Sequence, residues 1–500
     1  MMSTRTNNAI KNISYNIGYQ LLMLVLGFVN RTIFLYFLNV EYLGIQAVFK
    51  DILTLLSMAD LGLITAMTYS FYKPLAEKNE TYISGLVHFY KKVCNVIALV
   101  IFLGGLGLIP FLKYVVNLKT DLPHLTLYYL LYLLNTVASY IVVYKTTVLV
   151  ADQKGYITAK YGSIFNILQN IVLCLFLWLT HNFLVYLIIQ VFFTYIYNFV
   201  VSAIASKEYP YINEKVSLAK DDIRGLFDNI KAVFVYKTSN VLINATDSTL
   251  ISIIVGTIVV GFYSNYMLVV SKAISLLTTV FNSLTASLGN LIVEEGKAKR
   301  YEVFQILQTI CSGLSVIVVT LMFFLLQDFI RLWLGKAYLL DTLVLYAIII
   351  NLYFSVILLP VWVYREATGL YKQIKYVMLG TAGANLLLSI ILGHFIGLPG
   401  ILFGTVLAKL LTYVWYEPIL LFKQFFGHSS RSYFLELLKN IALILVLFLL
   451  GSLLSRFLFV TGYLSFICKA FLLLVLSVSC VYIFYRKSTG LRFVKAKFGL

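Results

Sequence analysis

Charged and amide side chains lie inside several long apolar stretches of the chain. Four of them follow one another at intervals of 3, 4 and 3 residues within the stretch 223–256: Lys237, Asn240, Asn244 and Asp247. One continuous helix would carry all four on a single face. A charged group that faces lipid at the middle of a membrane costs about 2.5–3.5 kcal/mol, so such groups normally face protein or water. The spacing therefore predicts a polar stripe that lines an interior cavity.

Three other apolar stretches carry comparable stripes. They are Asn16, Gln20, Gly27 and Arg31; then Gln46, Lys50, Thr54 and Ser57 with Asp60 beside them; and Ser264, Ser271, Ser275, Thr279 and Asn282 with Lys272 adjoining. Ser, Thr and Asn often only join helices in membranes, at about 0.6 kcal/mol per hydrogen bond. A buried charge is different, because it needs a partner.

The charge balance in the stripes indicates what they would bind. Cations outnumber acids, so an anionic ligand is expected to supply the missing charge. We therefore predict six substrate-binding residues around one shared cavity: Arg31, Lys50, Lys237, Asn240, Asn244 and Lys272. Asp247 and Asp60 are the candidates for coupling to Na⁺ or H⁺. Lys50 could instead pair with Asp51 or lie near a surface, and Lys409 and Glu417 are weaker candidates for the same cavity.

Residues for enzymatic chemistry are not arranged in any recognised pattern. The five His are scattered, the five Cys lie in apolar runs without paired spacing, and no phosphate-binding loop occurs. We therefore expect no catalytic residues, no metal site, no disulfide framework and no hydrolysis of ATP. The chain is expected not to be an enzyme and to need no cofactor.

Composition places the chain in a lipid bilayer. Of 500 residues, 61% are hydrophobic and only 12% charged, whereas a soluble domain has roughly 25% charged residues. The net charge of +18 would suit a nucleic-acid partner, but the charges lie in short connections between apolar stretches. There they set topology and contact anionic lipid headgroups, so no nucleic-acid partner is expected.

Each membrane span needs about 20 mainly apolar residues. Cutting the chain at polar breaks predicts fourteen helices, at 12–36, 42–70, 82–112, 123–150, 156–180, 183–206, 223–256, 260–292, 300–327, 339–364, 370–393, 397–424, 434–457 and 461–485. Pro110 and Pro360 are expected to bend the chain. The connections placed outside hold five Lys and Arg, far fewer than those placed inside, so both termini are predicted to be cytoplasmic.

A duplication is visible when the chain is aligned with itself at an offset of about 217 residues. The offset places Gly44 on Gly261 and pairs four short segments in order, each at the same point of a six-helix pattern. This predicts an all-helical fold with two pseudo-symmetric six-helix lobes and two additional C-terminal helices. The expected parts are an N-lobe (1–206), a cytoplasmic linker (207–222), a C-lobe (223–426) and an extension (427–500) with a basic tail.

Three segments of the chain resemble a known family. VNRTIFLYFLNVEYLGIQAVFKDILTLLSMADLGL (29–63), followed by FYKPLAEKNE (71–80), resembles the start of bacterial Wzx-type flippases of the MOP exporter superfamily. TDSTLISIIVGTIVVGFYSNYMLV (246–269) resembles the start of their second lobe. The resemblance places Arg31 on the basic position of the family's first helix, and Asp60 and Asp247 on acidic positions.

The resemblance implies a flippase of the bacterial cytoplasmic membrane. Its substrate would be an undecaprenyl-diphosphate-linked oligosaccharide, moved from the inner to the outer leaflet by alternating access for capsule or O-antigen synthesis. Membrane lipids and polysaccharide polymerase or assembly proteins would be its partners. A multidrug/cation antiporter of the same superfamily is the main alternative, followed by a polytopic glycan polymerase or acyltransferase, and a scaffold for glycosyltransferases is a further one.

Overall fold

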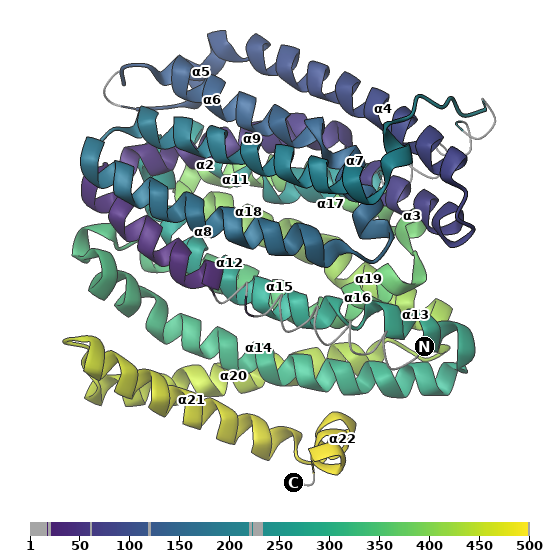
Figure 1. Ribbon diagram of the computed structural model, residues 1–500. Helices are drawn as coiled ribbons and strands as arrows, with labels where there is room; N and C mark the ends of the chain where they lie inside the picture. Colours follow the sequence, from purple (N-terminus) through teal and green to yellow (C-terminus); the bar gives the residue numbers. More distant parts are fainter. Residues whose placement is uncertain are drawn as a thin grey trace. The chain divides into compact units, whose positions relative to one another are not determined.

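The computed structural model describes residues 22–60, 63–118, 122–219 and 234–498, together with Gly18 and Ile223. Every regular element in these ranges is helical (Figure 1). The chain divides into two compact units, residues 1–261 (unit 1) and 262–500 (unit 2).

Unit 1 begins with the helix Leu22–Phe37. The helices that follow are α2 (Val40–Leu56), α3 (Leu63–Ala76), α4 (Glu80–Gly107), α5 (Leu112–Val115), α6 (Leu125–Ala138), α7 (Val143–Ala151), α8 (Gly155–Thr180), α9 (Phe183–Glu208), a helix at 234–244 and α11 (Asp247–Ile254). Short 3-10 turns, listed here in order, join several of them: η1 (Ser57–Asp60), η2 (Ile109–Phe111), η3 (Ser139–Ile141) and η4 (Pro210–Asn213).

Unit 2 continues from α12 (Thr257–Asn282), whose first residues belong to unit 1. Its helices are α13 (Thr285–Glu294), α14 (Lys297–Leu334), α15 (Thr342–Ile357), α16 (Leu359–Thr368), α17 (Tyr371–Ile396), α18 (Leu398–Leu411), α19 (Tyr413–Leu421), α20 (Arg431–Phe457), α21 (Tyr463–Tyr485) and α22 (Thr489–Phe498). A 3-10 turn, η5 (Lys336–Tyr338), and a π-helical turn, η6 (Phe422–Phe426), complete the unit.

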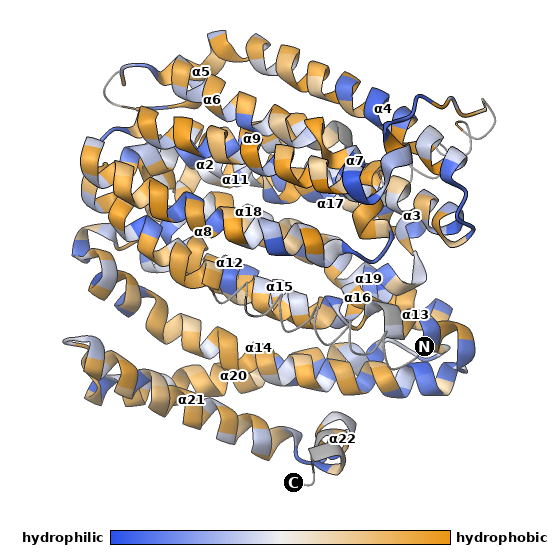
Figure 2. Ribbon diagram, viewed as in Figure 1, coloured by the Kyte–Doolittle hydropathy of each residue, from blue (hydrophilic) through white to orange (hydrophobic). Residues whose placement is uncertain are grey.

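The protein is a multi-pass membrane protein. Within the described residues, nine helices are long and apolar enough to cross a membrane, and two bent pairs raise the number to eleven. Figure 2 shows hydrophobic residues along most of α20 and α21, while hydrophilic residues gather at the N-terminal end of α14. These eleven correspond to eleven of the fourteen predicted segments.

The other three predicted spans are not confirmed. Of 12–36, the structure describes a short apolar helix, Leu22–Phe37. The segment 42–70 is interrupted, because α2 has 17 residues and is followed by the turn Ser57–Asp60 before α3 begins. The segment 223–256 is broken at residues 245–246. Hydropathy averages composition over a window, so it passes over such breaks without registering them.

The two bent pairs differ in cause. Pro360 lies in the first turn of α16, and the axis bends by 43° from α15 to α16, because proline has no N–H to continue the preceding helix. The predicted bend at Pro360 is confirmed. Between α6 and α7 the bend is 47° without a proline. There the Asn198 side chain donates to the main-chain oxygen of Ala138 at 2.8 Å, which satisfies a carbonyl next to the break.

A close helix crossing in unit 1 relates two glycines reciprocally. A Cβ atom on Gly44 would lie 2.0 Å from the carbonyl oxygen of Thr257, and a Cβ on Gly261 would lie 2.3 Å from that of Val40. Each glycine thus packs against the residue four positions before the other. Gly44 and Gly261, and likewise Val40 and Thr257, stand 217 residues apart. Reciprocal contacts of this kind arise where two equivalent surfaces meet about a two-fold axis.

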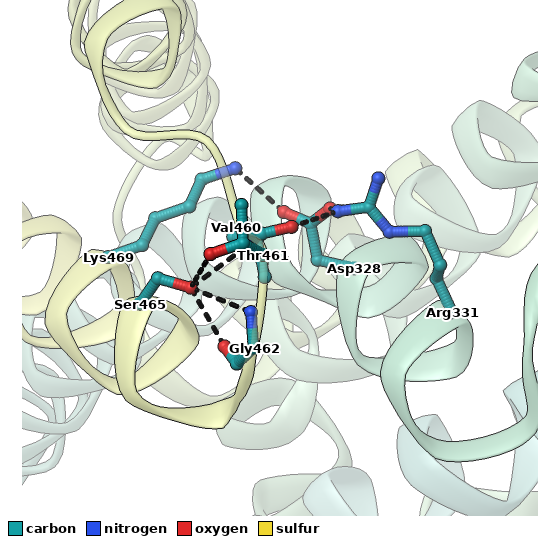
Figure 3. A network of polar contacts seen from close by, with 7 residues as sticks. All are labelled: Asp328, Arg331, Val460, Thr461, Gly462, Ser465 and Lys469. Carbon is teal, nitrogen blue, oxygen red and sulfur yellow. Dashed lines mark hydrogen bonds and ion pairs between the residues drawn. The ribbon is translucent and has the colours of Figure 1, made fainter.

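An ionic network fixes the C-terminal helices to α14 (Figure 3). The Asp328 carboxylate accepts hydrogen bonds from Lys469 Nζ at 2.8 Å and Arg331 Nη2 at 2.9 Å. The same guanidinium nitrogen donates to the Val460 carbonyl oxygen, also at 2.9 Å, in the connection between α20 and α21. Lys469 is only 7% exposed. Lys469 is therefore paired within unit 2, where the Asp328 carboxylate contacts two cations.

Candidate functional site

Arg31 lies in a polar cluster formed by four helices of unit 1. It is carried by Leu22–Phe37 and is partly exposed. The preceding residue, Asn30, donates to Asn170 Oδ1 on α8 at 2.8 Å and accepts from Tyr186 on α9 at 3.2 Å. Tyr186, together with Tyr132 on α6, acts electrostatically on Arg31.

The neighbouring charged residues Lys50 and Asp51 of α2 differ in their surroundings. Lys50 is exposed, whereas Asp51 points toward α11, and its Oδ2 accepts a hydrogen bond from the main-chain N–H of Ser248 at 3.0 Å. The first N–H groups of a helix have no partner within the helix, so a carboxylate is a suitable acceptor for them. Asp51 therefore joins α2 to the start of α11.

The predicted stripe on 223–256 is only partly continuous. Within the helix 234–244, Asn244 Nδ2 donates to Asn240 Oδ1 at 2.6 Å, so these two amides share a face, which also carries Lys237 by its spacing. The helix is interrupted at 245–246, and Asp247 begins α11. The interval of three from Asn244 to Asp247 therefore does not run along one helix, and this part of the predicted stripe is wrong.

The remaining predicted residues are placed less completely. Lys272 lies on α12 in unit 2, partly exposed. Asp60 ends the turn η1, and its side chain lies outside the described residues. Asn16 and Gln20 also lie outside the described residues. The structure thus places Arg31, Lys50, Lys237, Asn240, Asn244 and Asp247 in unit 1 and Lys272 in unit 2. Their joint role in one cavity remains a prediction.

Unit 2 contains a buried ion pair between Arg365 and Glu417 that the sequence analysis did not predict. Arg365 Nη1 lies 3.0 Å from both carboxylate oxygens of Glu417, and the two side chains are 7% and 2% exposed. Glu417 therefore meets its countercharge inside the protein. Lys409, the other weak candidate, donates to Asn351 Oδ1 at 3.0 Å and is 7% exposed. Neither supports an extension of the predicted cationic site into unit 2.

Helices α17 and α18 are joined by buried hydrogen bonds. Thr405 Oγ1 donates to Asn385 Oδ1 at 2.9 Å, and Ser389 Oγ lies 3.0 Å from the Ile401 carbonyl oxygen. These groups satisfy one another, as polar side chains between membrane helices generally do. Among the residues that the structure describes, no three His, Cys, Asp or Glu side chains are grouped to hold a metal ion.

A charged cluster joins the ends of helices in unit 1. Lys154, just before α8, lies 2.7 Å from Glu208 Oε1 and 3.0 Å from Asp152 Oδ2. The Tyr209 hydroxyl donates to the same Asp152 oxygen at 2.5 Å. Burial alone would lower the pKa of Lys154, but hydrogen bonds to Glu208, Asp152 and Tyr209 raise it above its ordinary value. The cluster fixes the helix ends and keeps its cation paired, so we assign it a structural role.

Comparison with known proteins rests on three-dimensional structure, because no protein-family model and no curated protein sequence matches the chain. The chain is similar to the lipid II flippase MurJ in an inward closed conformation, with TM-score 0.68 and 15% identity over 95% of this chain and 99% of that one. It has the MOP-superfamily fold.

Two multidrug transporters share this MOP-superfamily fold. An inward-facing multidrug resistance MATE family transporter gives TM-score 0.60 and 12% identity over 81% of this chain and 97% of that one. The MATE multidrug transporter DinF-BH gives TM-score 0.60 and 13% identity over 85% and 97%. The prediction of a MOP-superfamily architecture is confirmed. All three of these structures are of transport proteins.

Proposed function

We propose that the chain is a flippase for an undecaprenyl-diphosphate-linked oligosaccharide repeat unit. It moves the lipid from the inner to the outer leaflet of the bacterial cytoplasmic membrane by alternating access, with both termini in the cytoplasm. The product enters capsule or other surface polysaccharide synthesis, so polymerase or assembly proteins are its partners downstream.

The extent of the likeness to MurJ carries this proposal. It covers 95% of the chain, whereas the two multidrug transporters cover 81% and 85%. The difference is comparable with the length of the C-terminal helices α20–α22, residues 431–498. The lipid flippase therefore matches more of this chain than the multidrug transporters do. For that reason we favour a lipid-linked substrate over a drug as the cargo.

The charge pattern supports an anionic headgroup. Arg31 lies near the side chains of Tyr132 and Tyr186, while the buried acid Glu417 is paired with Arg365 and the partly buried Asp328 with Lys469 and Arg331. A diphosphate is recognised by guanidinium and ammonium groups, of which guanidinium can bind two oxygens at once. Arg31, Lys50, Lys237 and Lys272, with the amides of Asn240 and Asn244, are the proposed contacts.

Energy would come from an ion gradient or the membrane potential, which supplies about 2.3 kcal/mol per charge per 100 mV. Asp247 is the proposed coupling acid, with Asp60 as the second choice, because binding of Na⁺ or H⁺ at a carboxylate would change the charge near the substrate. An Asp247→Asn variant whose transport kept the wild-type dependence on both gradients would contradict this role.

A multidrug/cation antiporter is the second candidate, favoured by the likeness to the MATE transporters. Its cargo would be cationic and would need accessible acids rather than accessible cations.

A binding competition in nanodiscs separates the two. We expect wild-type protein to bind a fluorescent undecaprenyl diphosphate oligosaccharide that a lipophilic cationic dye does not displace. Arg31→Ala should weaken binding at least about tenfold, since a hydrogen bond to a charged group contributes about 1.5–3 kcal/mol, and Arg31→Lys should restore part of it. Displacement by the dye, with Arg31→Ala unchanged, would favour the antiporter.

A further inference from the structure

A cavity of about 330 Å³ opens between α8 and α9 in unit 1. Its walls combine three aromatic rings, two side-chain amides, two threonines and two small residues: Phe165, Phe193 and Tyr197; Asn166 and Gln169; Thr158 and Thr194; Ala159 and Gly162. The volume is at the lower end of the range of about 300–1,000 Å³ for small-molecule sites.

The α8 wall is one helix face. The residues that α8 contributes are spaced by 4, 3, 1 and 3 positions: Thr158, Gly162, Phe165, Asn166 and Gln169. This spacing places them on one side of the helix over about 17 Å of its length. The helix is long and apolar enough to span the membrane. Amides at that depth are unfavourable against lipid, so this face is one that meets protein or water.

The absence of charged residues from the cavity lining indicates what kind of ligand the cavity would bind. None of the nine residues that line the cavity is Lys, Arg, Asp or Glu. A cationic drug would call for a carboxylate and a phosphate for a guanidinium or ammonium. Aromatic faces beside amides and hydroxyls instead suit a neutral molecule with an apolar face and a hydroxylated edge. A sugar ring has both.

The cavity wall is held in place by contacts between the two helices and within α8. The Phe165 and Tyr197 rings meet edge to face, with centroids 6.0 Å apart. The Tyr197 hydroxyl donates to the Thr158 carbonyl oxygen at 3.4 Å, and Asn166 Nδ2 donates to the Gly162 carbonyl oxygen at 2.8 Å. The rings and the Asn166 amide are thereby set before any ligand arrives, which reduces the entropy lost on binding.

Gly162 keeps this wall open. A Cβ atom added there would lie 3.7 Å from the Tyr197 hydroxyl, an ordinary van der Waals distance. A larger side chain at position 162 would therefore extend into the cavity without striking the backbone, and leucine also has the higher helix propensity. This position allows the cavity to be filled while the fold is kept.

We propose that the α8–α9 cavity binds a sugar of the lipid-linked oligosaccharide and so helps to select which repeat unit is transported. The inference rests on the proposed function and assigns the sugar to a site lined by different residues from the cations expected to bind the diphosphate. The cavity takes one sugar ring, and the rest of the oligosaccharide and the polyprenyl chain lie outside it.

The test compares lipids with and without sugar. Protein in nanodiscs is titrated with undecaprenyl diphosphate and with a panel of undecaprenyl diphosphates that carry disaccharides of glucose, galactose or N-acetylglucosamine. Wild type is expected to bind one of the sugar-bearing lipids at least about tenfold more tightly than the sugar-free lipid. Gly162→Leu should abolish that preference and leave binding of the sugar-free lipid unchanged.

Two further variants make the outcome specific. Gln169→Leu removes an amide without filling the cavity and should reduce the preference. Gly380→Leu, on α17 where no atom lies within 4 Å of an added Cβ, should leave the preference unchanged. Melting temperatures confirm that each variant is folded.

The remaining outcomes distinguish the two proposals. A wild type that binds none of these lipids contradicts the proposed function itself. The cavity assignment alone is overturned if wild type binds all of these lipids equally. It is also overturned if Gly162→Leu and Gln169→Leu are both folded and each keeps the wild-type preference for a sugar-bearing lipid. Loss of cationic-dye binding in Gly162→Leu would also overturn it, because the cavity would then hold a drug.

Discussion

Arg365 and Glu417 form a buried ion pair in which a single substitution should have a large effect on stability. The pair is almost wholly buried, and each group neutralises the other across α16 and α19. Replacing Glu417 would leave Arg365 buried with only the partly exposed Glu366 at 3.7 Å as a countercharge. Removing the main partner of a buried charge typically costs about 3–5 kcal/mol. Replacing both by apolar residues of similar size is often neutral or stabilising.

Glu417→Gln should accordingly lower the free energy of unfolding by about 3–5 kcal/mol, measured by thermal unfolding in detergent. Arg365→Met combined with Glu417→Leu should recover most of the loss. The matched control is Glu302→Gln, which removes the ion pair between Glu302 and Lys299. Both side chains are about half exposed, and an ion pair of this kind contributes at most about 1 kcal/mol to stability. Equal effects at positions 417 and 302 would be inconsistent with a buried pair.

Sequence spacing found part of what the structure shows at this scale. It placed Asn240 and Asn244 on one helix face, which their hydrogen bond confirms. It failed for Asp247, because an interval of three residues marks a shared face only when the helix is unbroken. Arg365 was missed for another reason: it follows the predicted span 339–364 directly and therefore counts as part of a connection. Its partner is 52 residues away, and periodicity does not pair residues so far apart.

Among the elements, the crossing of α2 with the start of α12 leaves no room for a side chain at two glycines. Gly44 and Gly261 each face a carbonyl oxygen of the other segment at a distance that admits no side chain. The offset of 217 residues found in the sequence reappears here as a pair of exchanged contacts. A duplication of the chain at that offset predicts such an arrangement, whereas chance similarity between apolar helices gives no reason for reciprocity.

Gly44→Ala and Gly261→Ala should each destabilise the protein by about 1–3 kcal/mol through overpacking. Because both act on one crossing, the double variant should lose less than the sum of the two. Gly289→Ala serves as the control, since no atom lies within 4 Å of a Cβ at that position of α13, and it should be neutral or stabilising by up to about 1 kcal/mol. A Gly44→Ala variant as stable as wild type, or fully additive effects, would argue against the reciprocal crossing.

Helix boundaries were the least predictable feature of the elements. Eleven predicted spans correspond to helices or bent helix pairs, but 42–70 is interrupted at Ser57–Asp60 and 223–256 at residues 245–246. Both interruptions occur in sequence that is apolar enough to continue a span. Beside the second break the Thr246 hydroxyl donates to the Leu242 carbonyl oxygen, and hydropathy records neither the break nor the contact.

At the scale of the whole molecule, composition and charge distribution predicted a multi-pass helical protein, and the structure agrees. The fold aligns with MurJ over nearly the full length of both chains. The same fold also serves multidrug transporters, so architecture alone does not choose the cargo. The cargo proposed above rests on the extent of the likeness to MurJ and on two acids of unit 2, Glu417 and Asp328, that already have cationic partners.

The most direct measurement is transport in proteoliposomes. A fluorescent undecaprenyl diphosphate oligosaccharide is placed in the leaflet that corresponds to the cytoplasmic side, and its arrival in the opposite leaflet is followed with a membrane-impermeant quencher under imposed sodium and proton gradients. Wild-type protein should move the lipid faster than protein-free liposomes do, and Arg31→Ala should reduce the rate at least about tenfold. Lipid movement no faster than in protein-free liposomes, together with gradient-driven export of a cationic dye, would contradict the account.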